Sequence, residues 1–262
     1  MKRLLSIIVM ACTIMACTGD VNTDAMNVIA HRGGAALGPE NTLSCIREGI
    51  KAGADAVEVD VHLTADGYIV VCHDETLDRT TSGKGRIEDL TLEQVQAVTI
   101  PYGESVERIP RLEEVLELIS GRCKLLLEIK KSREGQYQGI EDKVMDILTR
   151  TGMKDQVVIQ SFNDGVLERI HEIAPDMPLE KLIICRLPFG LAYDIKVRRF
   201  SLDDYPYVRS INPNNTLTSK RFIRKVHEKG KMVRVWTVDK PRKVKKGADA
   251  VITNHPDRFR KQ

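Results

Sequence analysis

The sequence predicts an α/β protein folded as one (β/α)₈ barrel, the TIM-barrel arrangement, and three observations lead to this fold class. Short runs rich in Val, Ile and Leu alternate along the chain with segments of helical periodicity. These runs are largely continuous in their apolar character, which is typical of parallel strands covered by helices. About eight of them in 262 residues match a barrel of ~250 residues, and no linker or internal repeat divides the chain.

The expected strands and helices alternate along most of the chain. Strands are expected at residues 28–30, 56–61, 68–72, 125–129, 157–160, 182–185, 208–211, 232–236 and, as a last short run, 250–253. Apolar residues recur at helical spacing over residues 42–52, 111–120, 140–151, 164–173 and 219–229. This alternation predicts βα units built around a parallel sheet.

One βα unit lacks room for its helix. Residues 57–63 and 68–74 are separated only by residues 64–67, which end in the turn-forming pair Asp-Gly. The chain therefore returns either as a hairpin or as a tight parallel strand. A hairpin closed by a two-residue turn would set Asp60 opposite His73, with both side chains on one face.

The first residues predict an export signal and a lipid anchor. Lys2 and Arg3 precede an almost unbroken apolar run, which is too short to span a bilayer as a helix but fits a signal peptide. Ala16-Cys17 resembles the site at which a bacterial lipoprotein is cleaved and acylated. Ala11-Cys12 is a second candidate, disfavoured because its apolar run would be very short, and an ordinary signal cleaved nearby is the other alternative. The predicted organisation is a signal at 1–16, a tether at 17–27 and a barrel domain at 28–262. We therefore expect an exported protein anchored by Cys17 in the cell envelope, as a periplasmic or outer-membrane lipoprotein.

The composition excludes two classes of protein. The net charge of +3 is far from the strongly basic balance of a typical nucleic-acid binder. Hydrophobic residues make up 42% of the chain and run throughout it, which excludes disorder as the main state. The barrel domain has cysteines at positions 45, 72, 123 and 185 with no C-x-x-C pair, which argues against structural zinc. We expect buried thiols, with disulfides as the alternative.

Carboxylates occur at the predicted strand ends, where the active sites of such barrels lie. Glu58 and Asp60 alternate along the second strand, and Glu128 interrupts the apolar fourth strand. A buried carboxylate needs a cation or a hydrogen-bonding partner. Three of them without a nearby cysteine favour one hard divalent cation, Ca²⁺ or Mg²⁺, over zinc. A buried ion-pair network with Arg32 or Lys130 is the alternative.

Histidines and basic side chains follow the same strand ends. His31 and Arg32 come directly after the first strand, His73 after the third and Lys130 after the fourth. Imidazoles titrate near neutral pH and suit a general acid and a general base. A guanidinium and an ammonium group suit the oxygens of a phosphate. Together with a metal, these groups predict phosphodiester cleavage.

Nine motifs stand in a fixed order along the chain. They are His31-Arg32-Gly33-Gly34, Pro39-Glu40-Asn41-Thr42, residues 58–67, residues 70–85, residues 109–116, Leu127-Glu128-Ile129-Lys130, Ser161-Phe162, Trp236-Thr237-Val238-Asp239 and Ile252-Thr253-Asn254. In this order they resemble the glycerophosphodiester phosphodiesterase family. The resemblance extends from Ile29 to about Asp257, essentially the whole barrel domain.

The resemblance implies a barrel of the phospholipase-C-like phosphodiesterase type, with a small insertion after the third strand at about residues 75–109. It implies hydrolysis of a small glycerophosphodiester to glycerol 3-phosphate and an alcohol such as choline, ethanolamine, inositol or glycerol. The implied site residues are Glu58, Asp60 and Glu128 as metal ligands, His31 and His73 as acid and base, Arg32 and Lys130 as phosphate contacts, Glu40 and Asn41 as supporting residues, and Phe162 and Trp236 in the substrate pocket. Phe162 and Trp236 have barrel-mouth packing as an alternative role, and His62 is not expected to be a ligand.

Two rival functions use the same fold. A related enzyme would cleave lysophospholipids or glycerophosphoinositol with the same metal and histidines and a different pocket. A lipid-anchored binding protein that had lost catalysis is the non-enzymatic alternative. It is disfavoured because such a loss normally removes a metal carboxylate or a catalytic histidine, and all five are present. One departure from the family pattern is the short segment at residues 240–249, which predicts that one or two helical turns are missing there.

Overall fold

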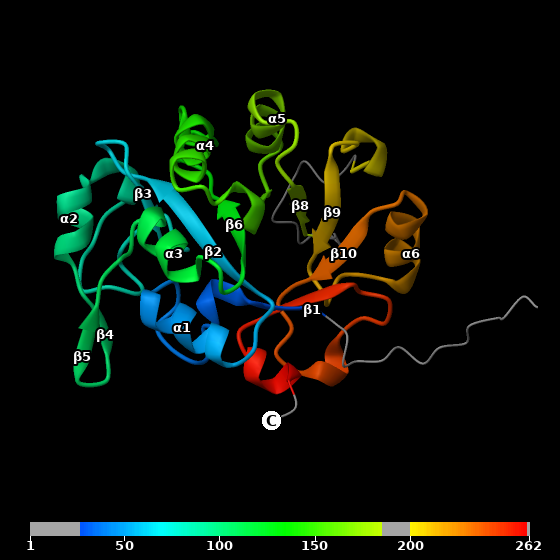
Figure 1. Cartoon of the computed structure of the whole chain (residues 1–262), viewed down its shortest axis with the longest axis horizontal. Helices are drawn as coiled ribbons and strands as arrows, with labels where there is room; N and C mark the ends of the chain where they lie inside the picture. Colours follow the sequence, from blue (N-terminus) through cyan, green and yellow to red (C-terminus); the bar gives the residue numbers. More distant parts are fainter. Residues whose placement is uncertain (1–26, 185–199, 261–262) are drawn as a thin grey trace, which may run out of the picture.

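The computed structural model describes residues 27–184 and 200–260, and its central feature is a closed barrel of eight parallel strands (Figure 1). In barrel order the strands are β1 (Asn27–Ala30), β2 (Ala56–Leu63), β6 (Lys124–Ile129), β7 (Val157–Ser161), β8 (Leu179–Ile183), β9 (Val208–Pro213), β10 (Met232–Val235) and β11 (Ala250–Thr253). The barrel closes because β1 pairs with both β2 and β11. The predicted (β/α)₈ fold is confirmed.

Helices surround the barrel, and the five expected helices are present to within one residue at either end. They are α1 (Leu43–Lys51), α3 (Leu112–Ile119), α4 (Ile140–Arg150), α5 (Asp164–Ile173) and α6 (Lys220–Glu228). Side-chain oxygens of Thr42 and Ser219 accept backbone N–H bonds at the starts of α1 and α6. Between β10 and β11 the chain forms the 3₁₀ turn Pro241–Lys243 instead of an α-helix, in line with the short segment there.

The alternation of β2 explains why the site lies inside the barrel. Val57, Val59 and Val61 face outward and are fully buried in the core shared with the helices. Glu58 and Asp60 therefore point inward. An apolar cluster fills the interior toward the amino ends of the strands, and it consists of Ile29, Ala56, Leu126, Val158, Ala250 and Ile252. The carboxylates thus lie between an apolar floor and the carboxyl ends of the strands.

The third expected strand is not part of the barrel. β3 (Ile69–Val71) runs antiparallel to the end of β2, with Val61 opposite Val71, so the hairpin alternative is the one present. Its expected place in the barrel is taken by the last short run, β11, which pairs with β1 and β10. His73 therefore follows the returning arm of a hairpin, not the carboxyl end of a barrel strand.

The register of this hairpin differs from the predicted one. Asp60 lies opposite Cys72, whose N–H donates to the Asp60 carbonyl at 3.0 Å, so the predicted pairing of Asp60 with His73 is wrong by one residue. The cause is the turn at residues 64–68, which closes around a three-residue loop instead of a two-residue turn. Gly67 adopts φ +85° in this loop, a conformation that glycine takes without strain.

The segment after β3 is an insertion that the sequence predicts only in outline. It contains α2 (Leu92–Ala97) and the antiparallel pair β4 (Ile100–Tyr102) and β5 (Ser105–Glu107), which lie away from α6 in Figure 1. A separate apolar cluster that includes Leu77 and Ile109 holds it together. Elements of six, three and three residues are too short to show a clear period, which explains why they were not predicted.

The start of β8 lies three residues before the expected strand, because two charged residues hide its pattern. Glu180 faces the barrel interior and forms ion pairs of 3.0 Å with Arg209 and with Arg234. Lys181 lies 2.6 Å from Asp164. Glu180 and Lys181 are buried in these ion pairs, so two charged residues interrupt the apolar pattern directly after Leu179.

The remaining expectations concern the amino-terminal segment, the cysteines and the membrane. The predicted signal, Cys17 and all of the tether except Asn27 lie outside them, as does Cys185. Cys45 and Cys72 are buried free thiols, and Cys123 is a partly buried one. Within residues 27–184 and 200–260, no helix combines the length and the apolar character needed to cross a bilayer.

Candidate active site

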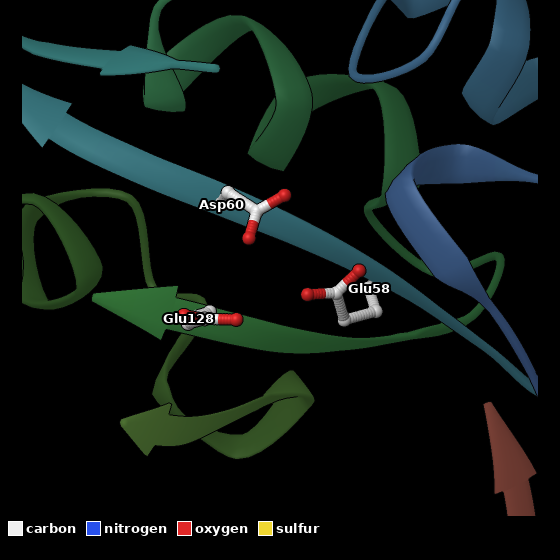
Figure 2. A group of neighbouring side chains, drawn as sticks. All are labelled: Glu58, Asp60 and Glu128. Atoms are coloured by element: carbon white, nitrogen blue, oxygen red, sulfur yellow. The ribbon is translucent and has the colours of Figure 1, made fainter. Parts of the chain in front are cut away.

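Three carboxylates meet inside the barrel near the carboxyl ends of β2 and β6. Glu58 and Asp60 are each 1% exposed and Glu128 is 7% exposed, and one oxygen from each lies within 4.8 Å of the others. Asp60 is paired in register with Glu128 on the adjacent strand, and Glu58 precedes Asp60 by two positions. Figure 2 shows the three side chains converging from these two strands. The sequence prediction that these residues come together is confirmed.

The charges of this cluster are only partly balanced by protein groups. Lys130 Nζ lies 2.9 Å from Glu128 Oε1 and 3.1 Å from Asp60 Oδ1, so the predicted ion-pair alternative is present in part. Burial would raise the pKa of Asp60, but the positive charges of Lys130 and its neighbours lower it. Burial and the neighbouring carboxylates raise the pKa of Glu58 well above its ordinary value, and burial is the main cause that raises the pKa of Glu128 to about 7.

Glu58 has only neutral hydrogen-bond partners within the described part of the chain. Its Oε2 accepts the backbone N–H of Arg32 at 2.8 Å, and its Oε1 accepts the Gln160 amide at 3.4 Å. An anionic oxygen in this position needs a positive charge. A set of buried carboxylate oxygens suits a hard divalent cation, so the residues present fit such an ion.

Residues of the Pro-Glu-Asn-Thr motif support both the cluster and Arg32. Asn41 donates to Asp60 Oδ2 at 2.9 Å and accepts the Asp60 N–H at 3.3 Å. Glu40 Oε1 accepts from Arg32 Nη1 at 2.9 Å. Arg32 and Asn41 both have left-handed backbone angles, φ +51° and +61°. Asparagine adopts this conformation more readily than most residues, whereas for arginine it is uncommon and marks a constrained site. The Nε of Arg32 is buried without a hydrogen-bond partner among the described residues.

His31 is held by a neutral amide. It starts the 3₁₀ turn His31–Gly33 after β1, and its Nδ1 lies 2.7 Å from Oδ1 of Asn254, which follows β11. The Asn254 amide nitrogen donates to Asp239 Oδ2 at 3.1 Å, which turns its oxygen toward His31. An amide oxygen only accepts, so Nδ1 carries the proton and Nε2 of the neutral ring has the free lone pair. Burial and the charge of Arg32 lower the pKa of His31 to about 4.

His73 is held by a carboxylate. Its Nδ1 lies 2.7 Å from Asp74 Oδ1, and Arg79 binds both oxygens of Asp74. Burial lowers the pKa of His73, and the negative charge of Asp60 and the hydrogen bond to Asp74 act in the opposite direction. A carboxylate partner stabilises the protonated imidazole more than a neutral amide does, because it adds an opposite charge to the hydrogen bond. Burial thus lowers the pKa of both histidines, and the two differ in the partner of Nδ1, which is neutral for His31 and anionic for His73.

A cavity of about 380 Å³ opens beside His31 and Arg32. Its lining residues come from the loops after β1, β10 and β11 and are His31, Arg32, Ala35, Ala36, Glu40, Thr237, Asn254 and His255. This volume lies toward the lower end of ligand pockets, which are about 300–1,000 Å³. The cavity suits a small polar ligand whose reacting group lies at His31.

The structure gives the contacts of three further residues considered in the sequence analysis, which are Phe162, Trp236 and His62. Phe162 and Trp236 pack edge to face with ring centres 5.6 Å apart, and the Trp236 indole N–H donates to the Asn212 carbonyl at 2.7 Å. They therefore pack against each other at the barrel mouth, and their place in the substrate pocket stays a prediction. His62 lies 2.7 Å from the Tyr137 hydroxyl through Nδ1, and its Nε2 lies 3.3 Å from the His73 carbonyl oxygen.

Four residues that hold the histidines and Arg32 were not predicted as site residues. Asn254 and Asp239 support His31, and Asp74 and Arg79 support His73. All four lie inside the ordered motifs, which was the available signal. Their partners are set by tertiary contacts, however, and Asn254 is 223 residues from His31.

Comparisons with known proteins agree with this geometry. The model of the "Glycerophosphoryl diester phosphodiesterase family" matches residues 31–258. The chain is 37% identical over 240 residues to a glycerophosphodiester phosphodiesterase of Caldanaerobacter subterraneus subsp. tengcongensis, a match that covers 88% of this chain and 94% of that protein. It is similar to the crystal structure of a glycerophosphodiester phosphodiesterase from Thermotoga maritima, with a TM-score of 0.70, 26% identity and coverage of 89% and 96%. A phosphodiesterase from Oleispira antarctica, solved with the product sn-glycerol-3-phosphate, has a similar fold, with a TM-score of 0.73, 24% identity and coverage of 89% and 94%.

Proposed function

The chain belongs to the glycerophosphoryl diester phosphodiesterase family, whose reaction is the hydrolysis of glycerophosphodiesters to glycerol 3-phosphate and an alcohol, and from this membership we propose how its own residues act. The observation that carries the proposal is the cluster of three buried carboxylates beside two histidines and an arginine that lines the cavity. Each of these groups has a role in phosphodiester cleavage as a metal ligand, an acid, a base or a phosphate contact.

The carboxylates of Glu58, Asp60 and Glu128 would hold one divalent cation, Ca²⁺ or Mg²⁺. When bound, this ion supplies positive charge that neutralises a phosphodiester and the charge developing on it. Lys130 already offsets part of the negative charge through its ion pairs with Asp60 and Glu128. Glu58 has neutral partners and a raised pKa, so it is the carboxyl group that most needs the cation in order to be ionised.

Arg32 binds the phosphodiester oxygens. Its Nη1 is held by Glu40 and its buried Nε lies 3.9 Å from Asp60 Oδ2, so the part of the guanidinium that lines the cavity is the part that meets a phosphate oxygen. A planar guanidinium suits this contact because it offers several N–H groups in a fixed geometry. Lys130, whose side chain is 15% exposed at the edge of the cluster, adds a second positive charge for the same phosphate.

His31 acts as the general base and His73 as the general acid. His31 presents a free Nε2 lone pair, and its low pKa keeps the ring neutral near pH 7. It takes the proton of the nucleophile, which is water or, through a cyclic phosphate, the glycerol 2-hydroxyl. The protonated ring of His73 donates its Nδ1–H to Asp74. It gives its other proton, on Nε2, to the leaving alcohol oxygen.

The substrate class remains the small glycerophosphodiesters, with lysophospholipids and glycerophosphoinositol as the alternative substrates. The small polar cavity beside His31 favours a compact ligand over one with a long acyl chain. The non-enzymatic alternative is set aside, because the chain is 37% identical to a glycerophosphodiester phosphodiesterase over 88% of its length and retains both histidines and all three carboxylates.

A membrane anchor at Cys17 would place this reaction in the cell envelope. The apolar run ending in Ala16-Cys17 supports this proposal. Metabolic labelling with a radioactive fatty acid tests it, and label is expected on the full chain and not on Cys17→Ser. Label that persists on Cys17→Ser would place the anchor elsewhere, and an unlabelled wild-type chain would contradict the anchor.

The test of the proposed function uses protein without residues 1–16, stripped of metal by a chelator. Ca²⁺, Mg²⁺, Mn²⁺ or Zn²⁺ is then added separately, and glycerol 3-phosphate release is followed from glycerophosphocholine, -ethanolamine, -glycerol and -inositol. A parallel assay with lysophosphatidylcholine follows choline and phosphocholine release. We expect release of glycerol 3-phosphate that Ca²⁺ or Mg²⁺ restores and Glu58→Gln abolishes. Full activity after chelation, or activity on the lysophospholipid alone, would contradict the proposal.

A further inference from the structure

The insertion after β3 delivers one guanidinium to the edge of the active site. Arg79 lies in this insertion and binds two carboxylates at once. Its Nη1 and Nη2 donate to the two oxygens of Glu40 at 3.0 and 2.6 Å. Its Nε donates to Asp74 Oδ2 at 2.6 Å, and Nη2 also donates to Asp74 Oδ1 at 3.1 Å. All three nitrogens of the guanidinium are therefore used.

The two carboxylates that Arg79 joins are those that hold the reacting side chains. Glu40 Oε1 accepts from Arg32 as well as from Arg79, at 2.9 and 2.6 Å. Asp74 Oδ1 lies 2.7 Å from His73 Nδ1 and 3.1 Å from Arg79 Nη2. A single nitrogen, Arg79 Nη2, thus lies between the oxygen that positions the phosphate-binding arginine and the oxygen that positions the proposed acid.

The electrostatics agree with this geometry. Hydrogen bonding from Arg79 is the main cause that lowers the pKa of Asp74 to about 2. Burial would raise the pKa of Glu40, but hydrogen bonds and positive charge from Arg79 and Arg32 lower it. Both carboxylates are therefore kept ionised. In this form Glu40 can accept from Arg79 and Arg32 together, and Asp74 from Arg79 and His73 together.

We propose that Arg79 is a positioning residue that fixes His73 and Arg32 relative to each other through Asp74 and Glu40. The proposal rests on the proposed function, because it assigns proton transfer to His73 and phosphate binding to Arg32. Among the described residues, Arg79 is bonded to Asp74 and Glu40 and not directly to His73 or Arg32. Its loss lets both carboxylates change orientation, and the two reacting groups then lose their mutual geometry. The insertion thereby contributes to catalysis without lining the cavity described above.

A second arginine of the same insertion provides a matched control. Arg86 also bridges two carboxylates, with Nη1 2.8 Å from Glu75 Oε1 and Nε 2.7 Å from Glu88 Oε1. Both of those acids belong to the insertion itself. Removing either arginine deletes a guanidinium bridge between two carboxylates, but only the Arg79 bridge leads to Arg32 and His73.

The test compares Arg79→Ala with Arg86→Ala. We expect kcat of Arg79→Ala to fall roughly 10- to 100-fold, the scale of a displaced catalytic group, with partial recovery on adding guanidinium but not ammonium. Arg86→Ala should retain wild-type kcat, and both variants should show a similar small decrease in unfolding temperature. Equal kcat values for the two variants at equal stability would overturn the proposal.

A second readout does not depend on turnover. The His73 Nδ1 proton, bonded to Asp74, should give a downfield proton NMR signal in the wild type and in Arg86→Ala, and that signal should weaken or move in Arg79→Ala. Its persistence unchanged in Arg79→Ala would overturn the positioning role. A wild-type protein inactive on every glycerophosphodiester, with the signal still lost in Arg79→Ala, would refute the proposed function and leave the positioning role standing.

Discussion

The two histidines of the site differ in what holds them. His31 stands at the end of a barrel strand and is held by the amide of Asn254 from another strand end. His73 stands on a loop after a hairpin and is held by Asp74, whose own partner Arg79 comes from an insertion. Either partner fixes the tautomer, but a carboxylate also adds an opposite charge and so favours the charged ring more than an amide does. The partner of Nδ1 is thus what distinguishes two imidazoles whose pKa values burial lowers alike.

The largest effect should come from removing either imidazole. His31→Ala and His73→Ala should each lower kcat on a glycerophosphodiester about 10²- to 10⁴-fold, the usual contribution of general acid–base catalysis. Circular dichroism and the unfolding temperature should remain close to those of the wild type. Near-wild-type kcat in either variant would show that the replaced histidine is neither the acid nor the base.

Exchanging the partners should move the pH profile in opposite directions. A carboxylate in Asn254→Asp raises the pKa of His31 from about 4, and His31 must be neutral, so the acidic limb of kcat/KM moves to higher pH. An amide in Asp74→Asn lowers the pKa of His73 further, and His73 must be protonated, so the basic limb moves to lower pH. We expect shifts of about one pH unit, or about tenfold in rate on the affected side. Movement of the same limb in both variants would break the comparison.

The carboxylate cluster lies between these two regions and should make metal binding depend on pH. Glu128 has a pKa raised to about 7, so below that pH a proton competes with the cation for its oxygens. The dissociation constant for Ca²⁺ or Mg²⁺ should rise about tenfold per pH unit below about pH 7, with one proton released per ion bound. Titration calorimetry in buffers of different ionisation enthalpy measures both quantities. A dissociation constant unchanged between pH 5 and 7 would contradict the assignment of Glu128 as a ligand.

The smallest effect should come from salt, and it should act on one region alone. Arg79 is 48% exposed, so its ion pairs with Asp74 and Glu40 are open to screening, whereas the bond between His31 and Asn254 involves no ion pair. Raising the salt concentration should lower wild-type kcat by no more than about threefold, because exposed ion pairs contribute little. The same change should have no effect on kcat in Arg79→Ala. An equal salt effect on that variant would show that the screening acts elsewhere.

Much of the fold follows from local pattern. Helical periodicity placed α1 and α6 to within a residue, and alternation along β2 placed Glu58 and Asp60 on the inner face. The register of β3 depends on one extra residue in a turn, which the sequence does not distinguish from a two-residue turn. The start of β8 was predicted three residues too late, because Glu180 and Lys181 look like surface charges in the sequence and find their partners only in the folded chain.

The reacting groups of the site could be predicted, and the groups that hold them could not. Histidine, arginine and acidic residues directly after apolar strands are visible in the chain itself, as with His31 and Glu128. The supporting role of Asn254 depends on the closing of the barrel, which brings β11 beside β1. The role of Arg79 depends on how the insertion folds back over Glu40. Such contacts between distant positions have no local sequence signature.

The most direct test of the opposite roles of His31 and His73 is the dependence on the leaving group. A glycerophosphodiester of 4-nitrophenol releases an anion that needs no proton, so a general acid becomes dispensable while a general base does not. We predict that His73→Ala recovers most of the wild-type kcat on this substrate and that His31→Ala remains as impaired as on glycerophosphocholine. Recovery in His31→Ala instead, or equal impairment of both variants, would contradict the account.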